Sequence, residues 1–295
     1  MGVRERFAGS VVLDGGLATE LERRGADLHD RLWSARLLIE DPDLIRRVHL
    51  AYFEAGADVA ISASYQASFE GFAARGIDRG GAADLLARSV RLAREAADES
   101  GPDRLVAASV GPYGAMRADG SEYSGRYGVS VERLIEFHRP RLEVLLAAEP
   151  DLLAVETIPS IEEAEAIVIV LDRYPEALAW IAFSCRDDER LSDGTPLAEA
   201  AALVASSDRV VGVGVNCTPA AFVPGLLRSA EVTKPMLAYP NLGSDWDPAA
   251  KAWRAVGPRP DLGAEADRWR EAGARIVGGC CGTEPRDIAA IAAGR

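Results

Sequence analysis

The sequence predicts an α/β protein that forms a single-domain (β/α)8 barrel, a TIM-like fold, over residues 1–295. Short runs rich in Val, Ile, Leu and Ala recur along the chain, and longer segments with helical periodicity separate them. The apolar runs are continuous rather than alternating, which is typical of strands that are buried on both faces. Strands that alternate with helices indicate βα units in a parallel sheet. The length of 295 residues is long for one domain, but single α/β barrels reach this size.

Eight apolar runs are interpreted as strands, spread from one end of the chain to the other. They are residues 11–14, 58–65, 105–111, 152–157, 178–184, 210–216, 236–241 and 275–279. The alternative is an open doubly wound sheet, which usually carries a Gly-rich phosphate-binding turn after its first strand. At that place "LDGGLATE" offers only Gly15 and Gly16. The barrel is therefore favoured.

The segments between these strands carry helix signals. In residues 40–57, Pro42 lies at an expected helix start, apolar residues are spaced for one face, and Gly56 follows the last turn. Residues 79–101 and 160–175 repeat this plan. The polar loop "GAMRADGSEYSGRYGVS" is long enough to cover an active site, and a simple surface excursion is the other interpretation.

The composition excludes several classes of partner. The formal net charge is −13 and the pI about 4.8, with acidic residues scattered along the chain. Such a surface repels phosphate backbones and anionic lipids, so we expect neither nucleic acid nor membrane partners. We find no run of 18 apolar residues and no signal peptide, and we expect a cytoplasmic protein. The sequence contains no decisive signature of an oligomeric state.

The cysteines carry the strongest chemical signal. There are four in the chain, too few and too irregularly spaced for a disulfide framework, so we expect thiols. Cys217 follows the sixth expected strand, and Cys280 and Cys281 follow the eighth. Strand ends of a barrel open onto one mouth, so these three thiols can meet there. Gly279 would allow the backbone to turn sharply just before the pair. Cys185 lacks such spacing and is interpreted as a core residue.

Three thiolates with no fourth protein ligand fit a catalytic zinc ion, which prefers thiolates and keeps an open position when it is catalytic. His29, His49 and His138 all lie away from the cysteines, and none is expected to be a fourth ligand. Plain packing and a redox or structural-metal role are the alternatives. A zinc ion with three thiolates carries a net charge of about −1, which makes it a poor Lewis acid but suits it to bind and deprotonate a substrate thiol. The implied reaction is attack by a thiol on an activated carbon.

At these residues the sequence resembles a known family. "GVNC" ending at Cys217, "GGCCGT" around Cys280 and Cys281, and the opening "DGGLATELERRG" are similar to the homocysteine S-methyltransferases. The phrases "LWSARLL", "ISASYQAS", "SVGPYGA", "LSDGTPL" and "YPN" extend the resemblance over essentially the whole chain. The similarity is greatest to the branch that uses S-methylmethionine.

The resemblance implies a zinc-dependent (β/α)8 barrel that methylates homocysteine to methionine with a sulfonium donor. Matched position by position, Cys217, Cys280 and Cys281 are the implied Zn²⁺ ligands, and the homocysteine sulfur would take the fourth position. Glu156, at the end of the fourth strand, is implied to pair with the substrate ammonium. Asp14, at the end of the first strand, would assist through its side chain or neighbouring backbone. Turn formation at Asp14 and a helix N-terminal charge at Glu156 are the alternatives.

The resemblance also implies residues near the methyl donor. Trp33 would offer a ring face to the sulfonium cation, with core packing as the alternative. Tyr65 and Gln66, at the end of the second strand, would line the donor side. S-methylmethionine is the expected donor, with S-adenosylmethionine or betaine as alternatives, and selenocysteine is an alternative acceptor. We expect no separate folate or cobalamin module.

Two functions from other classes stay open at this point. One is a non-catalytic zinc-binding or thiol-switch protein that uses Cys280 and Cys281 as a vicinal disulfide. A barrel aldolase or lyase would usually need a lysine at a strand end, and the chain has no lysine before Lys234 and Lys251.

Overall fold

The computed structural model describes residues 2–28, 30, 32–242, 244–247, 252–255 and 259–295; the side chains of Trp33 and of residues 244–247 and 252–255 lie outside this description. Eight parallel strands form one sheet in the order β1-β10-β7-β6-β5-β4-β3-β2. Its strands are β1 (Val11–Val12), β2 (Val59–Ile61), β3 (Leu105–Val110), β4 (Leu152–Ile158), β5 (Ala179–Phe183), β6 (Val210–Pro219), β7 (Met236–Asn241) and β10 (Ala274–Val277).

The sheet closes on itself between its first and last strands. Leu13, just after β1, forms a parallel bridge with Val59 of β2, and the Asp58 N–H donates to the Val12 carbonyl at 2.7 Å. The closed sheet confirms the (β/α)8 barrel and rules out the open doubly wound alternative.

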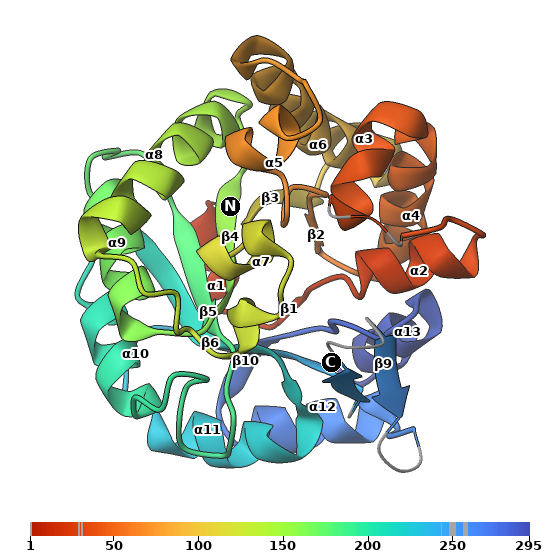
Figure 1. Cartoon of the computed structure of the whole chain (residues 1–295). Coiled ribbons are helices and arrows are strands. Elements are labelled where there is room, and N and C mark those ends of the chain that lie inside the picture. The colour runs from red at the N-terminus through yellow and green to blue at the C-terminus, as the bar shows by residue number, and fades with distance from the viewer. Residues whose placement is uncertain (1, 29, 31, 243, 248–251, 256–258) are drawn as a thin grey trace.

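Most of the helices form a ring around the barrel, whereas α1 and α7 lie inside that ring in the view of Figure 1. The helices are α1 (Val3–Phe7), α2 (Leu17–Arg23), α3 (Leu37–Glu40), α4 (Pro42–Glu54), α5 (Phe69–Ala73), α6 (Arg79–Ser100), α7 (Tyr113–Arg117), α8 (Val131–Ala147), α9 (Ile161–Leu171), α10 (Leu197–Ala205), α11 (Val223–Ser229), α12 (Leu262–Glu271) and α13 (Pro285–Ala293), with 3-10 turns η1 (Trp33–Arg36), η2 (Ser121–Tyr123) and η3 (Ala220–Phe222).

The three helices expected from the sequence are present as α4, α6 and α9. Asp41 caps α4 by accepting from the Leu44 N–H at 3.1 Å, and Gly56 follows the helix with φ of +100°. Ser160 caps α9 by accepting from the Glu163 N–H at 3.3 Å.

Two hydrophobic clusters fill the molecule, one between strands and helices and one inside the barrel. The inner cluster includes Ala107 of β3, Ala154 of β4 and Leu237 of β7. Because side chains alternate along a strand, the residues two positions further on also face the barrel interior, at the carboxyl ends of the strands. These residues are Ser109, Glu156 and Tyr239.

The structure differs most from the sequence-based expectation in two places. The expected strand 58–65 keeps only Val59–Ile61, because the chain then leaves the sheet to form the loop at the barrel mouth. An antiparallel hairpin, β8 (Ser244–Asp247) with β9 (Ala252–Ala255), was not predicted. Among the described helices, none has the length and apolarity needed to cross a bilayer.

Candidate active site

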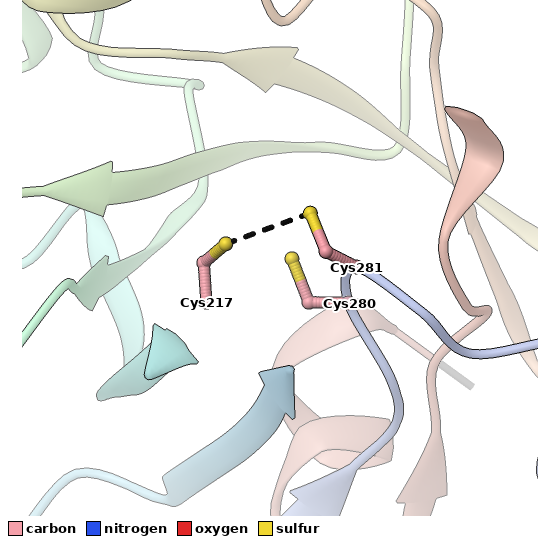
Figure 2. Close-up of side chains that lie close together, drawn as sticks. All are labelled: Cys217, Cys280 and Cys281. Carbon is pink, nitrogen blue, oxygen red and sulfur yellow. Dashed lines mark hydrogen bonds between the residues drawn. The ribbon is translucent and has the colours of Figure 1, made fainter. Parts of the chain in front are cut away.

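Cys217, Cys280 and Cys281 meet at the mouth of the barrel (Figure 2). Cys217 lies near the carboxyl end of β6, and the other two follow β10. The Cys217 and Cys281 Sγ atoms are 3.7 Å apart, and all three sulfurs lie within 4.8 Å of one another. All three cysteines are free thiols. The structure thus brings together the three residues that the sequence singled out.

The spacing of the sulfurs fits a tetrahedral metal ion. Zinc binds thiolates at about 2.3 Å, and two ligands of a tetrahedron at that distance are about 3.8 Å apart. The observed 3.7 Å agrees with this value and far exceeds the roughly 2.05 Å of a disulfide bond. The arrangement of the thiols can therefore hold a metal ion without a change of fold. Cys280 and Cys281 are both free, so they form no vicinal disulfide in this structure.

Backbone hydrogen bonds fix the loop that carries the cysteine pair. The Gly279 N–H donates to the Asp14 carbonyl at 3.0 Å, and the Cys280 N–H donates to the Pro240 carbonyl at 3.0 Å. A Cβ on Gly279 would lie 2.4 Å from Thr283 Oγ1, so only glycine fits here. The loop after β10 is thus held between the ends of β1 and β7.

Thr283 has a different role from the helix cap that its position suggests. Its hydroxyl accepts from the Gly16 N–H at 2.8 Å and donates to the Cys280 carbonyl at 2.6 Å. Glu284 takes the N-cap position of α13 instead. The threonine therefore ties the loop after β1 to the cysteine pair.

The three thiols shift one another's pKa. Hydrogen bonds from the Cys280 and Cys281 thiols hold the pKa of Cys217 well below its usual range. The same hydrogen bonding with Cys217 raises the pKa of Cys280 and of Cys281. The cluster is therefore arranged to carry negative charge at Cys217, which is the state that a metal ion requires of its ligands.

Glu156 lies at the end of β4 and faces the barrel interior. Ser109 Oγ donates to its carboxylate, and the Tyr239 hydroxyl is a second hydrogen-bond partner. Tyr239 in turn accepts from Trp180 Nε1 at 3.0 Å. Burial raises the pKa of Glu156 to about 7, against the lowering effect of its two hydrogen bonds and with a smaller contribution from Cys217. This carboxylate is held rigidly, close to the thiol cluster.

Asp14 follows β1 and is almost fully buried. Its Oδ2 accepts from the Ile61 N–H at 2.8 Å, whereas its Oδ1 is buried without a hydrogen-bond partner among the described residues. Burial raises the pKa of Asp14 well above its ordinary value, and the nearby Glu156 adds to the effect. An acceptor oxygen without a partner, in a cavity that also contains Glu156, is suited to bind a cationic group.

These groups line one cavity of about 100 Å³. Its lining includes Asp14, Gly15, Gly16, Ser34, Ser62, Tyr65, Tyr123, Glu156, Thr157, Asn216, Cys217, Tyr239, Gly279, Cys280 and Cys281. Gln66 is absent from the lining, and its amide donates instead to the Ala115 carbonyl at 3.0 Å. The side chain of Trp33 lies outside the described part of the structure.

The loop after β3 covers the barrel mouth. Its helix α7 lies in the middle of the ring of helices in Figure 1. Tyr123, in the following turn η2, places its hydroxyl 3.5 Å from Cys217 Sγ. Of the two interpretations of this loop, an active-site cover agrees with the structure.

Sequence reasoning missed four polar residues of the site. Ser109, Asn216 and Tyr239 lie at strand ends within motifs that the resemblance rested on, so their position at the mouth was the available signal. Tyr123 lies in an irregular loop, where no periodicity indicates a direction.

The remaining cysteine and the histidines lie elsewhere. Cys185 is buried in the outer hydrophobic cluster, where burial raises the pKa of its thiol, as expected of a core residue. His49 and His138 are buried on α4 and α8. His29 lies outside the described residues.

A closed barrel with a thiol cluster and two buried carboxylates at its mouth is typical of a barrel enzyme whose active site lies at the carboxyl ends of the strands. Comparison with known proteins gives the family. The family model described as homocysteine S-methyltransferase matches residues 11–294. A homocysteine S-methyltransferase of Bacillus subtilis, YbgG, is 49% identical, over 96% of this chain and 93% of its own. The Escherichia coli homocysteine S-methyltransferase is also 49% identical, over 96% of this chain and 94% of its own. The chain belongs to the homocysteine S-methyltransferase family.

A solved structure agrees with this assignment. The metallated form of the E. coli homocysteine methyltransferase MmuM superposes with a TM-score of 0.88 at 47% identity, covering 97% of this chain and 96% of that one.

Proposed function

We propose that the protein transfers a methyl group from a sulfonium donor to homocysteine and forms methionine, with a zinc ion held by its three clustered cysteines. The observation that carries the proposal is the separation of 3.7 Å between the Cys217 and Cys281 sulfurs, which matches tetrahedral coordination by thiolates. Membership in the homocysteine S-methyltransferase family supports the acceptor.

Cys217, Cys280 and Cys281 would hold the metal ion through their thiolates. When bound, zinc supplies a site for the substrate thiol and lowers its pKa, so that the sulfur is a nucleophile at neutral pH. The chain then needs no general base. Because the three ligands must stay reduced, we place the enzyme in the cytoplasm.

Glu156 and Asp14 would bind the ammonium group of homocysteine. Glu156 is held by Ser109 and Tyr239, and Asp14 offers the buried Oδ1 that has no partner among the described residues. Both carboxyl groups line the same cavity as the cysteines, so they would hold the amino-acid end of the substrate while its sulfur lies at the thiol cluster.

The donor would approach from the side of Tyr65, which lines the cavity. Aromatic faces attract sulfonium cations, which is the role we propose for Tyr65 and for Trp33. Gln66 would support this side indirectly, because its amide donates to the Ala115 carbonyl in the loop that covers the barrel mouth. S-methylmethionine is the donor we propose, with S-adenosylmethionine as the second choice.

Selenocysteine is a second candidate acceptor. A selenocysteine Se-methyltransferase of Brassica oleracea var. italica is 45% identical over 96% of this chain and 88% of its own. The selenol of selenocysteine would take the place of the homocysteine thiol, on a side chain that is shorter by one methylene.

The test is to measure zinc content together with methionine formation from homocysteine and S-methylmethionine. We expect about one zinc per chain and activity in the wild type, and loss of both in Cys217→Ala. Cys185→Ala is the matched control, because Cys185 is also buried but lies outside the cluster. An active, folded protein without zinc would contradict the proposal.

A further inference from the structure

Glu163 of α9 binds both ends of the segment that covers the barrel mouth. We call residues 113–127 the cover; it contains α7 and η2. At its first end, the Tyr113 N–H donates to Glu163 Oε1 at 2.6 Å. At its last end, the Tyr127 hydroxyl donates to Glu163 Oε2 at 3.0 Å. One carboxylate therefore fixes two points of the chain that are fourteen positions apart.

The surroundings of Glu163 hold it in this position. Its side chain is fully buried, and His138 Nε2 lies 2.9 Å from Oε1. Burial lowers the pKa of His138, so the neutral ring donates its Nε2 proton to the carboxylate. The Tyr113 ring packs edge-on against Phe137 with a centroid distance of 5.1 Å, and lies 5.4 Å from the Tyr127 ring. The carboxylate thus lies in an aromatic setting that excludes water and strengthens its hydrogen bonds.

Contacts within the cover transmit this anchoring to Tyr123. A Cβ on Gly114 would lie 2.4 Å from the Glu122 backbone nitrogen, so the helix α7 and the turn η2 are in direct contact. Ser184 Oγ donates to the Glu122 carbonyl at 3.3 Å. The residue before Tyr123 is therefore held by α7 on one side and by the end of β5 on the other.

Tyr123 is the residue of the cover that reaches the thiol cluster. Its hydroxyl lies 3.5 Å from Cys217 Sγ and is positioned to donate a hydrogen bond to this sulfur. Partners of metal ligands commonly orient them and tune their affinity for the ion. Cys217 is also the cysteine whose φ of +46° is unusual for a residue with a side chain, so its position depends on such contacts.

We infer that Glu163 is a positioning residue that fixes the cover by its two ends, so that Tyr123 donates a hydrogen bond to Cys217 in the metal-loaded centre. This inference deepens the proposed function and rests on it, since it assigns a partner to one of the proposed metal ligands. Glu163 touches neither substrate nor metal, and it acts through Tyr123.

Hydrogen exchange tests the anchoring without any metal. In the metal-free protein, Tyr127→Phe and Glu163→Gln should each raise exchange in peptides of residues 113–127 by about tenfold, with unchanged exchange in the barrel strands. Glu165→Gln is the matched control, because Glu165 is an exposed residue of the same helix. Tyr127→Phe removes a single hydroxyl, so it remains informative if Glu163→Gln folds poorly. Unchanged exchange in both variants would overturn the role of Glu163.

Cobalt binding tests the link to Cys217. We expect Tyr123→Phe to weaken Co²⁺ binding about tenfold, measured by competition with a chelator, and to shift the sulfur-to-cobalt charge-transfer band. Tyr127→Phe alone should weaken Co²⁺ binding and shift the band to a smaller extent. Added to Tyr123→Phe it should change neither quantity further, because both substitutions act through the contact between Tyr123 and Cys217. A looser cover with unchanged cobalt affinity and spectrum would overturn the link.

The two proposals can fail separately. Wild-type protein that binds no Co²⁺ or Zn²⁺ would contradict the proposed function and, with it, the metal-dependent part of this inference. Stoichiometric cobalt in the wild type with no effect of Tyr123→Phe would leave the proposed function intact and contradict the inference alone.

Discussion

Asn216 binds Thr157 through both ends of its side-chain amide. Its Oδ1 accepts from the Thr157 N–H at 2.6 Å, and its Nδ2 donates to Thr157 Oγ1 at 2.8 Å. The pair joins the end of β6, next to Cys217, to the end of β4, next to Glu156. Thr157 and Cys217 both have positive φ, at +60° and +46°. The asparagine therefore holds two strained strand ends that carry the proposed metal ligand and the proposed ammonium acceptor.

Removing this amide should destabilise the fold and the site together. We expect Asn216→Ala to lower the free energy of unfolding by about 2–4 kcal/mol, because two buried hydrogen bonds are lost and the Thr157 N–H is left without a partner. Thr157→Val removes only the hydroxyl and should cost about 1–2 kcal/mol. Urea unfolding of the metal-free proteins measures both. Losses near zero in both variants would show that the pair does not support the strand ends.

A methyl group on Gly279 should disturb the cysteine pair. The new Cβ would lie within 2.4–2.7 Å of three atoms of Thr283, which is fully buried and bonded to Gly16 and Cys280. We expect Gly279→Ala to cost about 1–3 kcal/mol of stability and to lower zinc occupancy. Gly80→Ala is the control, since the nearest atom to its Cβ is 3.6 Å away and alanine favours a helix. Full zinc occupancy in Gly279→Ala would contradict the expected disturbance.

The hydrogen bond from Ser109 should control the ionisation of Glu156. Burial raises the pKa of Glu156 to about 7, and donors to the carboxylate lower it. Ser109→Ala removes one donor, so the pKa should rise by about one unit. The Glu156 carboxyl, which we propose binds the substrate ammonium, would then ionise only at higher pH. The KM for homocysteine should therefore increase about tenfold near pH 6.5.

The measurement is the pH profile of kcat/KM for homocysteine, whose acidic limb should move upward in Ser109→Ala. Ser89→Ala is the control, because Ser89 is also buried but binds the Leu86 carbonyl within α6. An unmoved limb with a raised KM at every pH would indicate lost packing rather than a changed ionisation.

His49 should make stability depend on pH. Burial lowers its pKa from 6.5 to about 4, and neither ring nitrogen has a partner among the described residues. Between these values the unfolded chain binds a proton that the folded chain does not, so this contribution to stability is lost as the pH falls from 6.5 toward 4. At pH 5 the loss is about 2 kcal/mol.

Comparison with His49→Leu isolates the effect from that of other groups. The unfolding free energy of the wild type minus that of the variant should be about 2 kcal/mol lower at pH 5 than at pH 8. If the difference in unfolding free energy between wild type and variant is the same at pH 5 and pH 8, His49 is protonated as readily in the folded protein as in the unfolded chain.

Local sequence patterns predicted much of the fold of this protein and part of its site. Continuous apolar runs identified the eight strands, because strands covered on both faces need apolar residues at every position. Cys217, Cys280, Cys281, Glu156 and Asp14 follow such runs, and the carboxyl ends of parallel strands in a barrel share one mouth. The sequence patterns by themselves thus predicted the barrel and the three cysteines of its mouth, and the resemblance to a known family added Glu156 and Asp14.

The tertiary structure alone decided what holds these residues. The contacts that hold the site join residues far apart in the sequence: Ser109 reaches Glu156 across 47 positions, Asn216 reaches Thr157 across 59, Thr283 reaches Gly16 across 267 and Tyr123 reaches Cys217 across 94. The direction of a polar side chain in a loop depends on what packs against that loop, and no periodicity encodes it. Glu163 is the clearest case, since its helical position predicts only a buried carboxylate, and the folded cover supplies its partners.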